Sequence, residues 1–195
     1  PRFVRAIVPP ATRRAGTLRL APLVAGYRLR LVSGSRVRAA VVRIGLAGMA
    51  ADDFDAAAAA WARNELPALI RPEALARLRA HRDRGDVVTV VSGNFESLLR
   101  PWCEAEGVGL LASRLEIADG RLTGRYAGPQ CVLEEKAVRI RAAHDLATFG
   151  HVHAYGDTPE DVPLLTLASH AYYAGQPWPV GRDLLHGDAP YATTI

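Results

Sequence analysis

Apolar and polar positions along the chain change their spacing at about residue 85. Before it, apolar residues recur at helical intervals between prolines and glycines, so residues 1–84 are predicted to be all-helical. After it, short apolar runs alternate with helical segments, which favours a parallel, Rossmann-like sheet flanked by helices. We therefore predict an α/β fold with two domains, an all-helical cap over residues 1–84 and a Rossmann-like core over residues 85–195.

The same pattern predicts the individual elements. In the first half, Ser33-Gly34-Ser35 predicts the capped start of a helix through Ile44. Asp119-Gly120, between two short apolar segments, predicts a β-hairpin. The other helices are predicted over residues 52–65, 72–84, 95–106 and 134–145 and after Pro159, and the strands over residues 87–91, 109–112, 152–155 and 170–173.

An acidic loop follows the predicted strand at residues 152–155. The sequence there is Gly156-Asp157-Thr158-Pro159-Glu160-Asp161. Ligands of open α/β sheets bind at the carboxyl ends of the strands, and carboxylate oxygens suit Mg²⁺ better than Zn²⁺. Asp157 and Asp161 are therefore candidate metal-site residues. The alternative, that Asp157 and Thr158 only cap a helix, stays open at this point.

Two more polar positions, Ser92 and Lys136, are candidate ligand-binding residues. Ser92-Gly93-Asn94 comes after the β-branched run at residues 87–91, and a Ser followed by Gly at a helix start is a recurrent way to hold phosphate. Lys136 is the single lysine of a chain with 23 arginines, which suggests that a compact point charge is required there. A chance surface lysine is the alternative.

In that order, Ser92, Lys136 and the pair Asp157 and Asp161 resemble motifs two, three and four of the haloacid dehalogenase superfamily. The likeness is greatest to its phosphoserine-phosphatase-like branch, and it covers about residues 20–175. The resemblance implies a Mg²⁺-dependent phosphatase of a small phosphomonoester, working through an aspartyl-phosphate. It also implies that Ser92, Gly93 and Lys136 hold the phosphoryl group, that Asp157 ligates Mg²⁺, and that Asp161 supports the metal site.

The family's first motif, an apolar strand followed by D-x-D-x-T that supplies the nucleophilic Asp, is missing from this chain. No acidic residue precedes Asp52, and the one D-x-D spelling, Asp53-Phe54-Asp55, leads into an alanine-rich helical segment. Asp52 or Asp53 is predicted to cap that helix. We therefore expect the chain as given to be inactive as a phosphatase, and expect an upstream piece to supply the missing strand. The alternative function is a non-catalytic phosphate-binding or regulatory module.

The formal net charge of +4 conceals a strong asymmetry. Residues 1–51 carry ten arginines and no acid, while residues 52–195 carry thirteen Arg and one Lys against twenty acids. Such a basic amphipathic segment can rest on an anionic lipid surface or attract an anionic partner, the alternative being a solvated face of the helical cap. Nucleic-acid binding has only this charge in its favour. No apolar run approaches the roughly 20 residues of a membrane span.

Cysteine and histidine add little specific chemistry. Cys103 and Cys131 are too few for a disulfide framework and are predicted to be buried thiols, which favours a reducing, cytoplasmic setting. His151 and His153 lie two apart on a predicted strand and could form a metal pair. With no third ligand evident, structural histidines are the preferred interpretation.

Overall fold

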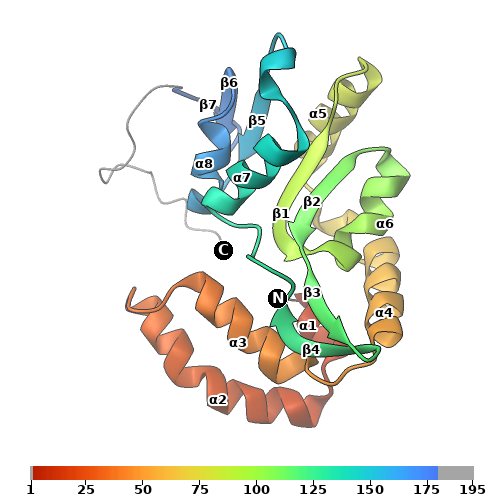
Figure 1. The fold of residues 1–195 in the computed structure, drawn as a ribbon, viewed down its shortest axis with the longest axis vertical. Helices are drawn as coiled ribbons and strands as arrows, with labels where there is room; N and C mark the ends of the chain where they lie inside the picture. Colours follow the sequence, from red (N-terminus) through yellow and green to blue (C-terminus); the bar gives the residue numbers. More distant parts are fainter. Residues whose placement is uncertain (1, 180–195) are drawn as a thin grey trace. The chain divides into compact units, whose positions relative to one another are not determined.

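A computed structural model of the chain describes residues 2–179. It separates into two compact units, one up to Gln130 and one from Cys131 onward. Figure 1 shows the elements of both, and each unit is described by itself below.

Helices and short connecting loops make up residues 2–83, as the sequence predicts for this segment. Ser33 caps its helix as predicted, since its hydroxyl accepts a hydrogen bond from the Arg36 N–H at 3.4 Å. The predicted cap at Asp52 or Asp53 is wrong: the N-cap is Ala50, and both acids lie in the first turn. The helices are α1 (Arg2–Ile7), α2 (Pro10–Arg28), α3 (Gly34–Leu46), α4 (Ala51–Asn64), the short η1 (Pro67–Leu69) and α5 (Pro72–Asp83).

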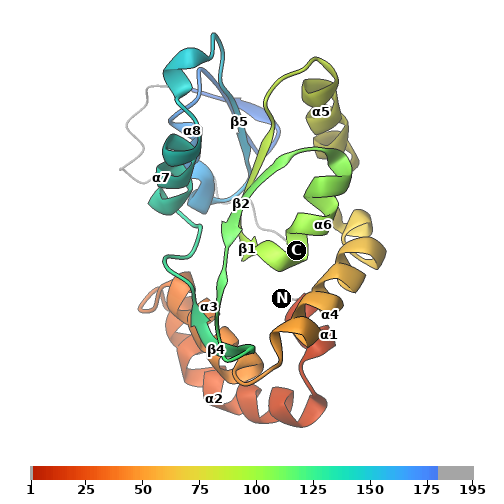
Figure 2. The same cartoon turned by 45° about the vertical axis from the view of Figure 1, so that its right-hand side comes forward.

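Four strands and a helix complete the first unit (Figures 1 and 2). Strands β1 (Thr89–Phe95) and β2 (Gly109–Ser113) pair in parallel, with α6 (Glu96–Glu106) between them in sequence and packed on them in space. Strands β3 (Leu115–Ala118) and β4 (Arg121–Tyr126) form the predicted antiparallel hairpin. Its turn residues Asp119 and Gly120 have φ of 49° and 70°, the left-handed conformation that an Asp-Gly turn supplies.

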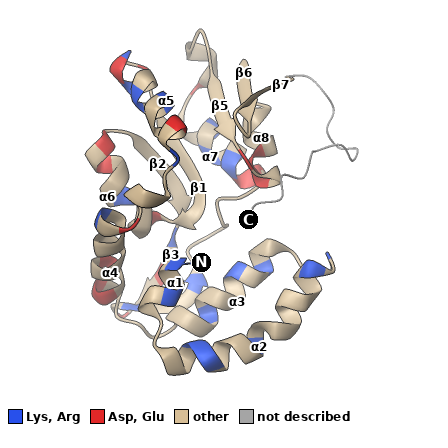
Figure 3. Ribbon diagram, turned by 180° about the vertical axis from the view of Figure 1, so that it is seen from behind, with Lys and Arg blue, Asp and Glu red and all other residues tan. Residues whose placement is uncertain are grey.

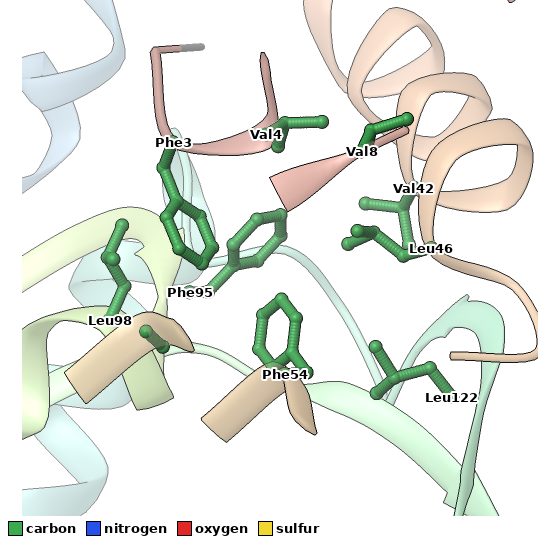
Figure 4. Packing of buried hydrophobic residues seen from close by; sticks show 10 residues of the cluster. Phe3, Val4, Val8, Val42, Leu46, Phe54, Phe95, Leu98 and Leu122 are labelled. Atoms are coloured by element: carbon green, nitrogen blue, oxygen red, sulfur yellow. The ribbon is translucent and has the colours of Figure 1, made fainter. Parts of the chain in front are cut away.

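Aromatic rings dominate the core of this unit. Phe3, Phe54 and Phe95 come from α1, α4 and β1, and their rings meet edge to face with centroids 5.7–6.5 Å apart. Figure 4 shows these rings together with the aliphatic side chains around them. The buried members of this core are Phe3, Val4, Val8, Val42, Leu46, Phe54, Ala58, Phe95, Leu98 and Leu122.

The hairpin is bound to the segment that joins α3 to α4. The Gly48 N–H donates to the Leu122 carbonyl at 2.8 Å, and the Leu122 N–H donates to the Met49 carbonyl at 2.9 Å. These bonds attach β4 to the helices. The predicted domain boundary between residues 84 and 85 therefore differs from the division of the structure after Gln130. The assignment of residues 1–84 as a cap stays a prediction.

The second unit is a small α/β layer. Strands β5 (His153–Gly156) and β6 (His170–Tyr173) pair in parallel, and β7 (Gln176–Trp178) pairs antiparallel with β6. The helical elements are α7 (Glu134–Ala143), η2 (Leu146–Thr148), η3 (Pro159–Asp161) and α8 (Val162–Leu165). A parallel pair in each unit, flanked by helices, confirms the predicted α/β fold class, whereas β7 was not predicted.

Candidate functional site

The candidate site in the second unit is built around a buried ion pair between Lys136 and Asp161. The two residues expose only 7% and 6% of their surface, and the ammonium Nζ donates a hydrogen bond to Asp161 Oδ1. Lys136 lies in the first turn of α7, where the helix dipole disfavours a cation. Asp161 offsets that cost, so the single lysine of the chain is a buried ion-pair partner and not a chance surface residue.

The second oxygen of Asp161 organises the loop that follows β5. Its Oδ2 accepts hydrogen bonds from the Asp157 N–H at 3.1 Å, from the Thr158 N–H at 3.0 Å and from the Thr158 hydroxyl at 2.8 Å. Burial alone would raise the pKa of Asp161. The hydrogen bond and charge of Lys136, with the donors of Thr158, outweigh burial and hold the pKa below its ordinary value. Asp161 is therefore ionised and serves as the acceptor at the centre of the loop.

Gly156 allows this arrangement because it has no side chain. A Cβ at this position would lie 2.5 Å from the Cβ of Asp161 and 3.0 Å from its Cγ. Any larger residue would push Asp161 away from Lys136 and from the loop. In the sequence, the only signal for this role of Gly156 is its place directly before the acidic loop.

The backbone before Lys136 is strained. Leu133, the N-cap of α7, has φ 51° and ψ −132°, a region that β-carbon-bearing residues rarely occupy. The next two residues, Glu134 and Glu135, fall in the first turn, where their charges suit the helix dipole. This bend sets the start of α7, and so sets which residue of that turn reaches Asp161.

Asp157 stands at the carboxyl end of β5 and is exposed. Its charge and that of Asp161 act on the buried Tyr173, whose pKa is raised by burial first and by the two carboxylates second. In residues 2–179 no group of three or more His, Cys, Asp or Glu side chains is placed to hold a metal ion. One carboxylate still fits Mg²⁺, which commonly takes one or two protein carboxylates and completes its shell with water and phosphate oxygens.

Ser92 and Gly93 lie in the first unit, inside β1 and not after its end as predicted. The pairing register with β2 breaks between Ser92 and Phe95, so the strand is irregular there. The Ser92 hydroxyl accepts from the Asn94 N–H at 3.2 Å, and the buried Ser113 hydroxyl donates to the Gly93 carbonyl at 3.1 Å. Convergence of this turn with Lys136 and Asp157, which lie in the other unit, stays a prediction.

Ser92 also lines an apolar pocket of about 250 Å³ in the first unit. The pocket lies among η1, α5, α6 and β1, and its wall includes Ile70, Leu75, Val90 and Trp102. Ser92 is the one hydroxyl-bearing residue among the residues that line this pocket.

The structure places the D-x-D residues within a helix and not after a strand. Asp53 and Asp55 are exposed residues of α4, and Phe54 between them is part of the core. This agrees with a helix and not with the strand-and-loop setting of a nucleophile motif.

The remaining candidates have other partners. The ring of His170 on β6 stacks on His153 at 4.6 Å and meets His151 edge to face at 5.3 Å, a third imidazole that sequence spacing did not reveal. Rings stacked face to face cannot both direct a nitrogen at one ion. Cys103 and Cys131 are buried thiols as predicted, and neither is in a disulfide. Burial raises the pKa of Cys103 to about 11.

A parallel strand pair in each unit, a lysine at the start of α7 and an acidic loop after β5 agree with the haloacid dehalogenase-like arrangement that the sequence motifs predict. Residues 1–166 match the family model described as haloacid dehalogenase-like hydrolase, and the chain belongs to this family. Its resemblance is to phosphoric monoester hydrolases of the phosphoserine-phosphatase-like branch.

Two relatives illustrate the match. Protein CicA of Caulobacter vibrioides is 32% identical over 164 residues, which cover 81% of this chain and 71% of that protein. A phosphoserine phosphatase of Halobacterium salinarum is 38% identical over 95 residues, or 46% of this chain and 44% of that protein.

Solved structures share the fold. A Bordetella pertussis protein with unknown function is 25% identical, with a TM-score of 0.68, over 78% of this chain and 71% of that one. A probable phosphoserine phosphatase from Vibrio cholerae is 16% identical, with a TM-score of 0.61, over 79% of this chain and 46% of that one. No helix within residues 2–179 has the length and apolar character to cross a membrane.

Proposed function

We propose that this chain carries the phosphate- and Mg²⁺-binding part of a phosphatase for a small phosphomonoester, phosphoserine being one candidate. The observation that carries the proposal is the buried Lys136–Asp161 pair, bonded to the loop of Asp157 and Thr158. Such a pair is costly to bury, and an anion-binding role for the ammonium gives it a function. The names of phosphatase relatives support the same substrate class.

Each residue has a role in the proposal. Lys136, at the start of α7, would bind a phosphoryl oxygen together with the helix N-terminus. Ser92 and the Gly93 backbone would bind further phosphoryl oxygens, and Asp157 would ligate Mg²⁺. When bound, Mg²⁺ would neutralise charge on the transferring phosphoryl group. Both oxygens of Asp161 already accept hydrogen bonds, so we assign it a positioning role beside the metal and not a ligand role.

Asp161 positions two functional residues at once. It holds the Lys136 ammonium at the start of α7, and its other oxygen holds the backbone of Asp157, so the cation and the metal ligand stay in a fixed relation. Because both groups must meet one phosphate, a fixed geometry lowers the entropic cost of binding.

The second candidate is a non-catalytic phosphate-binding or regulatory module, favoured by the placement of Asp53 and Asp55 on the exposed face of α4. A covalent carboxylate intermediate splits a hard phosphoryl transfer into two easier steps. Asp53 and Asp55, the D-x-D residues of the described part of the chain, lie on a helix and are not suited to that role. We expect the chain as given not to hydrolyse p-nitrophenyl phosphate with Mg²⁺. Clear turnover that Asp157→Asn abolishes would contradict this.

Calorimetric titration with inorganic phosphate, with and without Mg²⁺, tests the phosphate site itself. Phosphate binding should be weakened more than tenfold by Lys136→Met, at about 1.4 kcal/mol per tenfold. Arg141→Gln is the matched control, because it removes an exposed cation from the same helix, and it should leave binding unchanged. Asp157→Asn should remove only the Mg²⁺ dependence. Absence of phosphate binding by the folded chain, or equal effects of Lys136→Met and Arg141→Gln, would refute the proposal.

A reducing, cytoplasmic location is part of the proposal. Its support is that Cys103 and Cys131 are buried thiols that form no disulfide, which is the usual state of cysteines in a reducing compartment.

A further inference from the structure

The segment that joins α2 to α3 exposes both apolar and basic side chains. We call residues 27–36, which include Tyr27, Arg28, Leu29, Leu31 and Arg36, the α2–α3 tip. Tyr27 exposes 52% of its surface, Leu29 69% and Leu31 77%. Leaving two leucines so exposed to water is unfavourable, and large apolar side chains exposed close together in a short segment are a candidate interaction surface.

The tip is a defined turn and not a frayed end. The Leu31 and Val32 N–H groups both donate to the Gly26 carbonyl, at 2.8 and 3.2 Å, and Arg30 takes a left-handed φ of 60°. Val32 turns back and packs close to Gly26, where an added Cβ would meet it at 2.8 Å. The turn thus partly buries Val32 while Leu29 and Leu31 stay exposed.

The charge around the tip has a single sign. Helices α2 and α3 with their turn, residues 10–46, carry eight arginines and no Asp or Glu. Figure 3 shows blue positions along both helices and no red one, while α4 and α6 carry red. Of these arginines, Arg38 donates hydrogen bonds to the side chains of Gln130 and Ser35. Arg28 and Arg36, in contrast, are exposed at the tip. The local field therefore favours an extended anionic surface.

We propose that the α2–α3 tip docks on the surface of an anionic phospholipid bilayer. Leu29 and Leu31 would enter the boundary between headgroups and acyl chains, Tyr27 would lie at headgroup depth, and Arg28 and Arg36 would contact lipid phosphates. This combination of aliphatic and basic side chains on one surface is the pattern of interfacial membrane binding. The inference is independent of the proposed phosphatase site, since none of these residues belongs to it.

Nucleic acid is the competing polyanion, and the tip suits it less. Single-stranded nucleic acid is bound by aromatic rings on which bases stack, whereas the outward side chains here are mainly leucines. Trp61, Trp102 and Trp178 are separate from the tip in sequence and lie on α4, α6 and β7. Exposed aliphatic side chains are stabilised when they leave water for the acyl-chain boundary of a bilayer, whereas a phosphodiester backbone offers them no apolar surface.

Sedimentation of the full chain with vesicles tests the proposal. Binding is expected to vesicles of phosphatidylcholine mixed with phosphatidylglycerol, not to phosphatidylcholine alone, and to weaken with salt. Leu29→Ser with Leu31→Ser should weaken it about tenfold. Arg28→Gln with Arg36→Gln should weaken it about twenty-fivefold, because each arginine contributes about fivefold. Circular dichroism melting confirms that each variant is folded.

Matched controls change the same chemistry elsewhere on the first unit. Val87→Ser with Ile117→Ser removes two exposed aliphatic groups, and Arg63→Gln with Arg114→Gln removes two exposed charges. Neither should alter vesicle binding beyond about twofold. Leu31→Trp gives a gain-of-signal test. The fluorescence emission of the introduced tryptophan should shift to shorter wavelength with anionic vesicles and not with vesicles of phosphatidylcholine alone.

Three results would overturn the proposal. They are no binding to anionic vesicles, equal losses in the tip and control variants, or tighter binding to duplex DNA that the leucine substitutions leave unchanged. The last result would assign the tip to nucleic acid.

Discussion

Substitution of Gly156 by Ala would test the packing that the candidate site depends on. The new methyl group would lie 2.5 Å from the Cβ of Asp161 and 3.0 Å from its Cγ, where carbon atoms in ordinary contact stay about 3.5–4.0 Å apart. Relief requires a shift of about 1 Å by Asp161 or by the β5 backbone. Because Asp161 holds Lys136, Asp157 and Thr158, that shift would disturb all of these contacts.

The expected cost follows from two contributions. Overpacking of a close-packed site costs about 1–3 kcal/mol, and partial loss of a buried ion pair adds to it. We expect Gly156→Ala to lower the free energy of unfolding by about 3 kcal/mol. Gly150→Ala is the matched control in the same unit, because nothing lies within 4 Å of its added Cβ. That variant should be neutral or more stable by about 0.5 kcal/mol.

Urea unfolding of the three proteins measures these differences, since a lower midpoint with an unchanged slope reports stability alone. Hydrogen exchange gives a local readout, because the Asp157 and Thr158 amides donate to Asp161 and should exchange faster in Gly156→Ala. Equal stability of Gly156→Ala and Gly150→Ala, with unchanged exchange at both amides, would show that Asp161 does not pack over Gly156.

The ion pair, its titration and the strained helix start give three further predictions. Lys136→Met and Asp161→Asn should each lower the free energy of unfolding by about 3–4 kcal/mol. The double variant should lower it by about 2 kcal/mol less than the sum of the two, whereas additive losses would show that the two groups do not interact. The pKa of Asp161 in the folded chain lies below the unfolded value of about 3.9, so the unfolded chain binds more protons as the pH falls. The stabilisation by ionised Asp161 is therefore present above about pH 4 and is lost as the pH falls through the folded pKa. Urea midpoints should then fall more steeply below about pH 4 in the wild-type chain than in Asp161→Asn, and parallel falls would contradict this assignment. Leu133→Gly should stabilise the chain by about 1 kcal/mol in urea unfolding by relieving the strain at φ 51°, whereas Leu133→Ala, which keeps the strain, should give no gain.

Short sequence motifs predicted the fold well where the local backbone conformation requires a particular type of residue. Asp119-Gly120 was predicted as a hairpin turn because its conformation needs positive φ, and Ser33 was predicted as a cap because its hydroxyl can satisfy a helix N–H. Both are confirmed. The family resemblance carried by Ser92, Lys136 and Asp157 is confirmed by the family match over residues 1–166, whereas the roles of these residues stay predictions.

Features set by distant contacts were not predictable. Helix α4 begins at Ala51, one residue before Asp52, and the Ala51 N–H donates to the carbonyl of Gly120 on the hairpin. No local pattern contains that partner. Strand β7 follows a turn in which Ala174 takes a φ of 49°, a conformation that sequence reasoning assigns to Gly or Asn. The pairing of Lys136 with Asp161 across 25 positions likewise depends on the fold.

The bonds between the α3–α4 segment and β4 constrain the order in which the protein can fold. Gly48 and Leu122 are more than seventy positions apart, and Phe3 shares its core with Phe95. Contacts of such high sequence separation slow folding, because a long loop must close before they form. During synthesis, the first helices would leave the ribosome with their aromatic faces uncovered until the hairpin followed, and a chaperone able to shield them would raise the yield.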